Sequence, residues 1–177
     1  LQHAPAGKYG WLKARGGTFE FERKPGKPCR FYGVNLCFSA NYPTHEVADQ
    51  LIDRLVRLGY NSIRIHHHDD VWGNGDSEMR DRLDYMLAKA IEKGLYITTD
   101  MYVSRRVTWR QLGVDREGEV GMDLFKTLVG CFEPAYQNWC RFAKEFLEHR
   151  NPYTGRQYKD EPGLPLLSLI NEGGLFM

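Results

Sequence analysis

The chain has 177 residues, which is long enough for one domain with a sizeable core. Its 24 Lys and Arg residues nearly balance its 23 Asp and Glu residues, and the formal net charge of +1 gives no electrostatic reason to expect a nucleic-acid or anionic-membrane partner. No run of about 18 apolar residues is present, so the sequence predicts no membrane-spanning helix.

The two ends and the cysteines give little information about compartment. The chain starts at Leu1, without an initiator Met or an apolar signal core, and we expect a processed chain or a fragment. The four cysteines include no CxxC pair of the kind that binds zinc. Cys29 and Cys37 lie on one expected extended segment, too far apart to bridge each other, and we expect all four thiols to be free.

The first part of the chain has the pattern of a hairpin. Residues 1–18 are rich in Gly and Lys, which indicates an irregular segment. Residues 18–22 alternate apolar and charged side chains, as a half-exposed strand does, and residues 24–28 have the Pro and Gly content of a turn. Residues 30–36 again resemble a strand. We expect a hairpin whose second arm continues into the first strand of the main sheet.

Two helix–strand pairs follow. The first helix is expected to begin after Thr44 and end at Gly59, with an apolar face made by Val47, Leu51, Leu55 and Leu58. Residues 61–66 predict the second strand. Ser77 is expected to cap the second helix, which ends at Gly94 and has its apolar residues at Leu83, Met86, Leu87, Ala90 and Ile91. Residues 95–102 predict the third strand.

The last third of the chain contains a long connection, a helix and an apolar run. The connection covers residues 103–133, with a short helix expected over 122–128; connections of this length are usually functional or disordered. Pro134 fits the first turn of a third helix. The run from Leu164 is apolar on both faces, which predicts a fourth strand buried on both sides. It ends in Asn171 and Glu172.

The order of elements predicts an α/β fold. A hairpin followed by β-α-β-α-β-α-β favours a parallel sheet, and the missing GxGxxG pattern removes the usual support for dinucleotide binding. A (β/α) barrel is the favoured architecture, but a complete TIM barrel has eight strands. We therefore predict half of a TIM (β/α)8 barrel, with residues 1–30 forming the N-terminal segment and hairpin and residues 31–177 the first four β/α units.

Three strand motifs resemble a known group of enzymes. Residues 30–36 (RFYGVNL), 61–66 (NSIRIH) and 170–172 (INE) are similar to strands one, two and four of the clan A retaining glycoside hydrolases, closest to cellulase-like family 5 and its uncharacterised bacterial relatives. The resemblance implies that Glu172 is the general acid/base, that Asn171 binds the sugar 2-hydroxyl and that Arg64 supports the catalytic carboxylates. It also implies a nucleophile on a seventh strand, outside this chain.

Strand geometry gives independent expectations for the same residues. Retaining hydrolysis needs two carboxyl groups about 5–5.5 Å apart. Side chains alternate along a strand, so Arg64, His66 and His68 should share one face while Ile63 and Ile65 face the helices. A guanidinium inside the barrel needs carboxylate partners. The alternative is that Arg64 is a structural ion-pair residue of the core.

The remaining candidates would bind substrate at the carboxyl ends of the strands. His66 and His68 could donate hydrogen bonds to a sugar, and Trp72 and Trp109 could stack on sugar rings or simply pack their loops. The third strand ends in Asp100, Met101 and Tyr102 where family 5 often has a histidine. We therefore take the substrate-binding candidates to be His66, His68, Asn35, Trp72, Trp109, Tyr102 and Asp100.

Our first hypothesis is the N-terminal part of a secreted or periplasmic retaining glycoside hydrolase that cleaves a β-linked glycan, inactive when isolated and needing no cofactor. Its partners would be the polysaccharide or oligosaccharide and the missing second half-barrel. The alternative is a non-catalytic half-barrel that binds carbohydrate or assembles with a second copy, because open sheet edges invite pairing. A third possibility is a metal-dependent hydrolase using His66 and His68, although metal motifs such as HExxH are absent.

Overall fold

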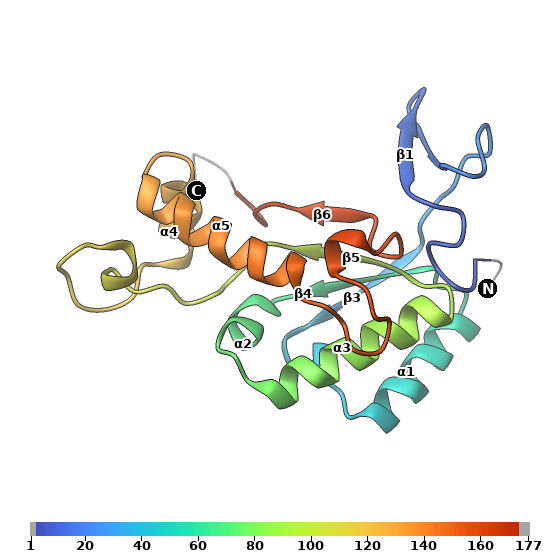
Figure 1. Cartoon of the computed structure of the whole chain (residues 1–177), viewed down its shortest axis with the longest axis horizontal. Helices are drawn as coiled ribbons and strands as arrows, with labels where there is room; N and C mark the ends of the chain where they lie inside the picture. Colours follow the sequence, from blue (N-terminus) through green and yellow to red (C-terminus); the bar gives the residue numbers. More distant parts are fainter. Residues whose placement is uncertain (1–2, 174–177) are drawn as a thin grey trace.

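A parallel four-stranded sheet lies at the centre of the structure, a computed structural model that describes residues 3–173 (Figure 1). The strands follow the order β3-β4-β5-β6, so each strand pairs with its neighbour in sequence. Their bounds are β3 (Gly33–Cys37), β4 (Ser62–His66), β5 (Tyr96–Asp100) and β6 (Leu166–Ser168). Four successive parallel strands joined by helices confirm the predicted α/β half-barrel.

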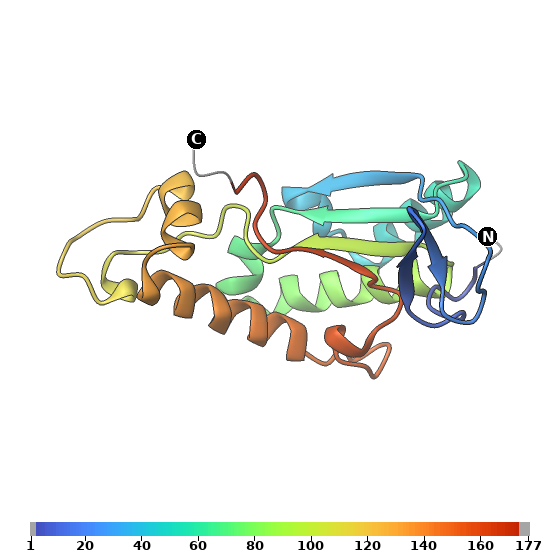
Figure 2. The ribbon, with the colours of Figure 1, turned by 90° about the horizontal axis from the view of Figure 1, so that it is seen from above.

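The main helices cover one face of this sheet, and Figure 2 shows α3 and α5 together on that face. The opposite face carries no helix among residues 3–173 (Figure 2). None of the helices in this part of the chain is long and apolar enough to cross a bilayer. The bounds are α1 (His45–Arg57), α2 (Asp69–Gly73), α3 (Ser77–Glu92), α4 (Met122–Val129) and α5 (Glu133–Glu148), with short 3-10 turns η1 (Phe38–Asn41), η2 (Arg110–Leu112) and η3 (Tyr158–Asp160).

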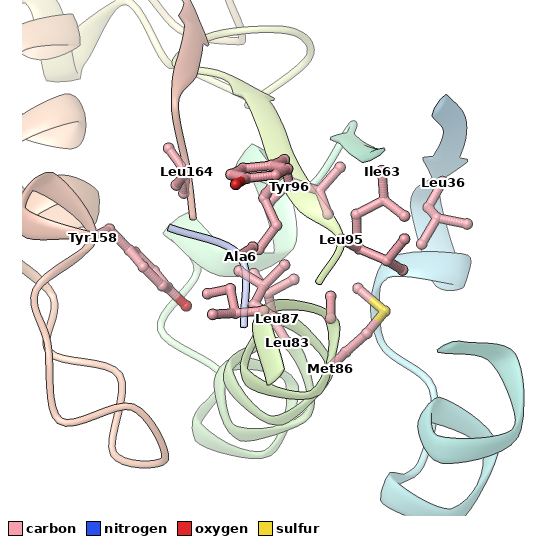
Figure 3. Close-up of a cluster of buried hydrophobic side chains, with 14 of the residues drawn as sticks. Ala6, Leu36, Ile63, Leu83, Met86, Leu87, Leu95, Tyr96, Tyr158 and Leu164 are labelled. Carbon is pink, nitrogen blue, oxygen red and sulfur yellow. The ribbon is translucent and has the colours of Figure 1, made fainter. Parts of the chain in front are cut away.

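The hydrophobic core lies between the sheet and these helices. Ile63 and Ile65 point from β4 into it and are fully buried, as the alternation along this strand predicts. Figure 3 shows Leu83, Met86 and Leu87 of α3 packed below the strands. A second, smaller core holds the long connection after β5 in place, and contains Tyr102, Val107, Leu112, Val120, Phe125 and Ala135.

The N-terminal hairpin differs from the predicted one. β1 (Leu12–Arg15) pairs with β2 (Thr18–Phe21), so residues 1–18 are not wholly irregular and the hairpin partner lies upstream of β2. The two-residue loop is Gly16 and Gly17, both at positive φ, which is the backbone that a tight hairpin requires. Only one antiparallel bridge, between Phe19 and Cys29, follows the predicted pairing.

Several helix and strand boundaries also need correction. In α1 the buried residues are Ala48, Ile52 and Leu55, whereas Val47 and Leu58 are exposed, because the apolar stripe is centred one residue further along than predicted. Thr44 caps α1 as predicted, with its side chain accepting from the Val47 N–H at 3.4 Å. The α3 cap is Asp76 instead of Ser77, since its carboxylate accepts from two backbone N–H groups, those of Glu78 and Met79.

The fourth strand is less buried than predicted. Leu167 of β6 is exposed, because β6 is the last strand of the sheet and nothing in residues 3–173 pairs with its outer edge. The short helix expected in the connection is confirmed as α4, and the third helix begins as expected, with Pro134 in the first turn of α5. The four cysteines are free, also as predicted.

Candidate active site

Asp100 is the centre of a polar cluster at the carboxyl ends of β4 and β5. Arg64 donates two hydrogen bonds to its carboxylate, from Nε to Oδ2 at 3.1 Å and from Nη2 to Oδ1 at 2.9 Å. His66 Nδ1 lies 2.9 Å from Oδ2. The three side chains meet because Arg64 is paired in register with Thr98, so that Arg64, His66 and Asp100 project from the same face of neighbouring strands.

The Asp100 carboxylate is fully buried and remains charged at neutral pH. Burial opposes the charge, but the hydrogen bonds from Arg64 and His66 and the positive charge of Arg64 outweigh it and lower the pKa of Asp100. Both carboxylate oxygens already accept hydrogen bonds. The side chain is therefore placed to hold Arg64, and it has no free face from which to attack a substrate.

Arg64 connects this cluster to the segment that follows β6. Its Nη2 also donates to Asn171 Oδ1 at 2.8 Å, and the Asn171 backbone N–H donates to the Tyr102 carbonyl at 2.9 Å. With the amide oxygen turned toward Arg64, the amide nitrogen of Asn171 points elsewhere and makes no hydrogen bond to any of residues 3–173. Arg64 therefore joins Asp100 to Asn171 through hydrogen bonds in the structure.

Glu172 follows directly but stands outside this network. Its side chain is 68% exposed, and its backbone is in the left-handed region with φ of 52°. The nearest cation is Lys126 of α4, whose Nζ lies 4.0 Å from Glu172 Oε2. The Lys126 side chain is only 2% exposed, and the sequence analysis did not identify it. The one signal in the sequence was a single Lys within the apolar stretch that forms α4.

The side chains of the three consecutive histidines do not lie on the same face of the sheet. Alternation holds up to His66, but His67 adopts a left-handed backbone with φ of 55°, which reverses the chain. His68 is consequently fully buried, with Nε2 2.7 Å from Thr99 Oγ1, and its ring packs on Phe146 of α5. The predictions that His68 shares the face of Arg64 and His66 and that it binds substrate are therefore wrong.

Two further substrate-binding candidates belong to the core. Trp72 is fully buried and packs edge-on against Phe142 and Phe146, so it holds the helix layer together. Tyr102 is buried in the second core, where its ring contacts Phe125. Neither ring can stack on a sugar in this structure, because both side chains are buried.

Asn35 and Trp109 keep some contact with solvent. Asn35 is exposed on β3 and paired in register with Arg64, so it lies on the face of the cluster. Trp109 is partly buried beside η2, and the guanidinium of Arg116 lies 4.7 Å from its ring centre. Their predicted roles as substrate-binding residues stay predictions.

Asp69 is a structural residue that the sequence did not reveal. Its buried Oδ2 accepts from the backbone N–H groups of Val103, Ser104 and Arg105 at 2.8, 2.9 and 2.8 Å. The carboxylate thereby fixes the start of the connection after β5 against α2. Nothing local in the sequence distinguishes it from its neighbour Asp70, because the partners lie more than thirty residues away.

The histidines and acidic residues form no metal centre within the described part of the chain. Among residues 3–173, no group of three or more His, Cys, Asp and Glu side chains is arranged to hold a metal ion. His66 is directed at Asp100, whereas His68 is buried under α5. The two side chains proposed for a metal-dependent hydrolase therefore do not converge.

Comparison with known proteins places the fold. No family model matches the sequence, and no curated protein matches it. The endo-1,4-beta-mannanase from Rhizomucor miehei is similar in structure, with a TM-score of 0.66 and 18% identity over 92% of this chain and 48% of that one. The chain therefore shares the fold of half a (β/α)8 barrel with this solved structure.

Two other solved structures agree with this half-barrel. The family 5 mannosidase from Rhizomucor miehei has a TM-score of 0.65 and 15% identity over 94% of this chain and 49% of that one. The endo-beta-1,4-mannanase from Thermotoga petrophila has a TM-score of 0.61 and 22% identity over 83% of this chain and 36% of that one. The half-barrel thus spans about half, or less, of the length of the solved structures it matches.

Proposed function

We propose that the half-barrel is part of a retaining glycoside hydrolase that cleaves a β-linked glycan, with Glu172 as the general acid/base. The observation that carries the proposal is the chain of contacts from Asp100 through Arg64 to Asn171, immediately before Glu172. These residues lie at the carboxyl ends of parallel strands, where barrel enzymes place their catalytic groups. The fold likeness to glycoside hydrolases supports the same reaction class.

Each residue would have a definite role. Glu172 would protonate the glycosidic oxygen as the bond breaks and then take a proton from the attacking water. Asn171, with its amide oxygen held by Arg64, would donate from its nitrogen to the sugar 2-hydroxyl. Asp100 would keep Arg64 in place. The second carboxylate, the nucleophile, would come from outside this chain.

The named activities of the similar structures suggest the first substrates to test. Two of them are described as endo-mannanases acting on β-1,4 linkages, so β-1,4-mannan is the substrate class we put first. A secreted or periplasmic location belongs to this proposal, since a polymeric glycan of this kind is met outside the cytoplasm.

The test is the substitution Glu172→Ala in the complete protein that contains this chain. Hydrolysis of the polysaccharide should fall by about 10²–10⁴-fold, the usual contribution of general acid/base catalysis. An aryl glycoside with an acidic phenol needs no proton on its leaving group, so its cleavage to the glycosyl-enzyme should persist. Added azide should then react with that intermediate, because azide needs no general base, and give a glycosyl azide.

Glu117→Ala is the matched control, because Glu117 is an exposed carboxylate on the connection after β5. It should leave both activities unchanged, namely hydrolysis of the polysaccharide and cleavage of the aryl glycoside to the glycosyl-enzyme. Equal loss of both activities in Glu172→Ala, or no loss of either, would show that Glu172 is not the acid/base.

The sheet edges favour one second candidate, a half-barrel that assembles with another. β3 and β6 are the two edges of the sheet, and Leu167 and Leu169 are exposed beside β6. Such edges pair readily with other strands. Sedimentation at micromolar concentration should then show a stable dimer, whereas a stable monomer would contradict this candidate.

A further inference from the structure

A pocket of about 480 Å³ lies beside the Asp100 cluster and has no role in the mechanism above. Five segments at the carboxyl end of the sheet line it: η1 with the residue that follows it, the turn between β4 and α2, the start of α2, the first turns of α3 and the connection after β5. Its apolar lining comes from Phe38, Tyr42, Val71 and Met79. The volume lies within the range of small-ligand sites in proteins.

The pocket is bordered by two aromatic rings in an unusual backbone conformation. Phe38 and His67 both have positive φ, 52° and 55°, although neither is a glycine. Their rings stack at 4.2 Å with 17° between the planes. Phe38 is 60% exposed, so burial does not explain why this conformation is kept. Strain of this kind persists where the surrounding structure enforces it and is frequent in ligand sites.

His67 presents a fixed polar atom to the pocket. Ser104 Oγ lies 2.8 Å from His67 Nδ1 and 3.4 Å from Asp69 Oδ1, and these contacts hold the His67 ring in place. Burial, together with the neighbouring charge of His66, lowers the pKa of His67 and so favours the neutral form of its imidazole ring. The second nitrogen, Nε2, can form a hydrogen bond with a hydroxyl group, which both donates and accepts.

The rest of the polar lining also suits hydroxyl groups. Asp70 accepts from the Arg106 side chain, and Arg82, which pairs with Glu78 of its own helix, also lines the pocket. The two guanidinium groups and the carboxylate offer donors and acceptors beside an exposed aromatic face. A pyranose ring has the matching chemistry, with an apolar face that packs on aromatic carbon and hydroxyl groups around its edge.

The position of the pocket separates it from the cleavage point. Val71 and Met79 belong to the helices on one side of the sheet, whereas Arg64 and Asp100 project from the other side. A glycan main chain bound at the Asp100 cluster would run over the open face of the sheet. A sugar in the pocket would therefore have to be a branch that projects away from that main chain. The ring centres of His66, in the Asp100 cluster, and His67, at the pocket, lie 4.2 Å apart, so the two sites are adjacent.

We propose that this pocket binds a single neutral pyranose branch of the glycan, with Phe38 as the stacking surface and His67 as a hydrogen-bond partner. The proposal rests on the proposed function for its substrate class, but not on Glu172. It makes the half-barrel selective for branched over unbranched β-linked glycans.

Binding to the 177-residue chain tests the pocket without any requirement for catalysis. The probes are branched oligosaccharides from galactomannan and xyloglucan, compared with unbranched mannotetraose and cellotetraose, with Kd measured by NMR titration. At least one branched probe should bind about five- to ten-fold more tightly than its unbranched counterpart, a factor typical of one aromatic contact. Equal Kd values for branched and unbranched probes would overturn the proposal.

Two substitutions at one position separate binding from folding. Phe38→Gly relieves the left-handed strain, and Phe38→Ala keeps it, while both remove the ring. Both should abolish the preference for the branched probe, and the Tm of Phe38→Gly should equal or exceed that of the unchanged chain. A preserved preference would refute the pocket as a sugar site. A large drop in Tm for both would show that Phe38 serves packing instead.

Phe19→Ala is the matched control, because Phe19 is an exposed phenylalanine on the N-terminal hairpin. It should leave the preference for branched probes intact. The outcome is independent of the Glu172→Ala test: binding selectivity lost with Phe38 but unchanged hydrolysis in Glu172→Ala would reject the catalytic assignment alone.

Discussion

The candidate site has one part at the centre of the sheet and one part beside its β6 edge. The two parts differ in how deeply their side chains are buried and in how many hydrogen bonds they accept. Asp100, between β4 and β6, is fully buried, and three hydrogen bonds from Arg64 and His66 reach it. Glu172, just beyond the edge strand, is 68% exposed, with Lys126 at 4.0 Å as its nearest cation. Asp100 is therefore enclosed by its hydrogen-bond partners, whereas the residue proposed for the chemistry is open to solvent.

This contrast follows from strand position. β4 and β5 have a neighbour on each side, so their register fixes where each side chain points. β6 pairs only with β5, and the segment after it is fixed mainly by Asn171. Among residues 3–173, Asp100 and Arg64 are thus held by several hydrogen bonds, whereas the Glu172 side chain has one weak ion pair. Substitutions in the two regions should therefore affect different properties.

The largest effect on stability should come from Asp69→Ala, at the ordered end of the comparison. Removing the carboxylate leaves three backbone N–H groups of the connection after β5 without their acceptor. Each unsatisfied buried group costs about 1–3 kcal/mol, so we expect a loss of about 3 kcal/mol or more in the free energy of unfolding, measured with urea. Asp115→Ala, at an exposed position, is the control, and a loss for Asp69→Ala below about 1 kcal/mol would contradict this role.

A smaller effect is expected from Asp100→Asn. The neutral amide leaves Arg64 without its charged partner, and because Arg64 is partly exposed we expect a loss of about 2 kcal/mol, below the cost of breaking a fully buried pair. The pKa of Asp100 is lowered from its ordinary 3.8, so its stabilising contribution is complete above that value and is lost as the pH falls through the folded-state pKa.

Urea unfolding of both proteins across pH 2–7 measures this dependence. The stability difference between the unchanged chain and Asp100→Asn should be constant above about pH 5 and should shrink as the pH falls below about 4. A difference that does not change with pH would mean that the charge of Asp100 plays no part in holding Arg64.

The smallest effect on stability should come from Glu172→Gln, at the exposed end. With most of its side chain in solvent and no close hydrogen bond among residues 3–173, the change should stay within about 0.5 kcal/mol. A loss comparable with that of Asp100→Asn would remove the distinction between the two regions.

Local periodicity predicted much of this arrangement. Alternation along β4 placed Ile63 and Ile65 in the core and Arg64 and His66 on the other face, and the order of elements gave the half-barrel. Alternation failed at His67, where one left-handed residue redirects His68 into the core. A sequence of three histidines carries no signal for such a reversal.

Other features depend on contacts between distant segments and were not predictable from local patterns. Asp69 accepts hydrogen bonds from the backbone of residues 103–105, and Lys126 of α4 lies 4.0 Å from Glu172. Trp72 is of a residue type that often stacks on sugars, but its ring packs between α3 and α5. In each case the partner, and not the residue type, decides the role.

The most direct test of the account is a crystal structure of the complete protein that contains this chain. If Glu172 is the acid/base of a retaining hydrolase, a second carboxylate should lie about 5–5.5 Å from its carboxyl group across an open cleft, with Asn171 still bound to Arg64. The absence of a second carboxylate near Glu172, or a separation of about 6.5 Å or more, would contradict the proposed retaining mechanism.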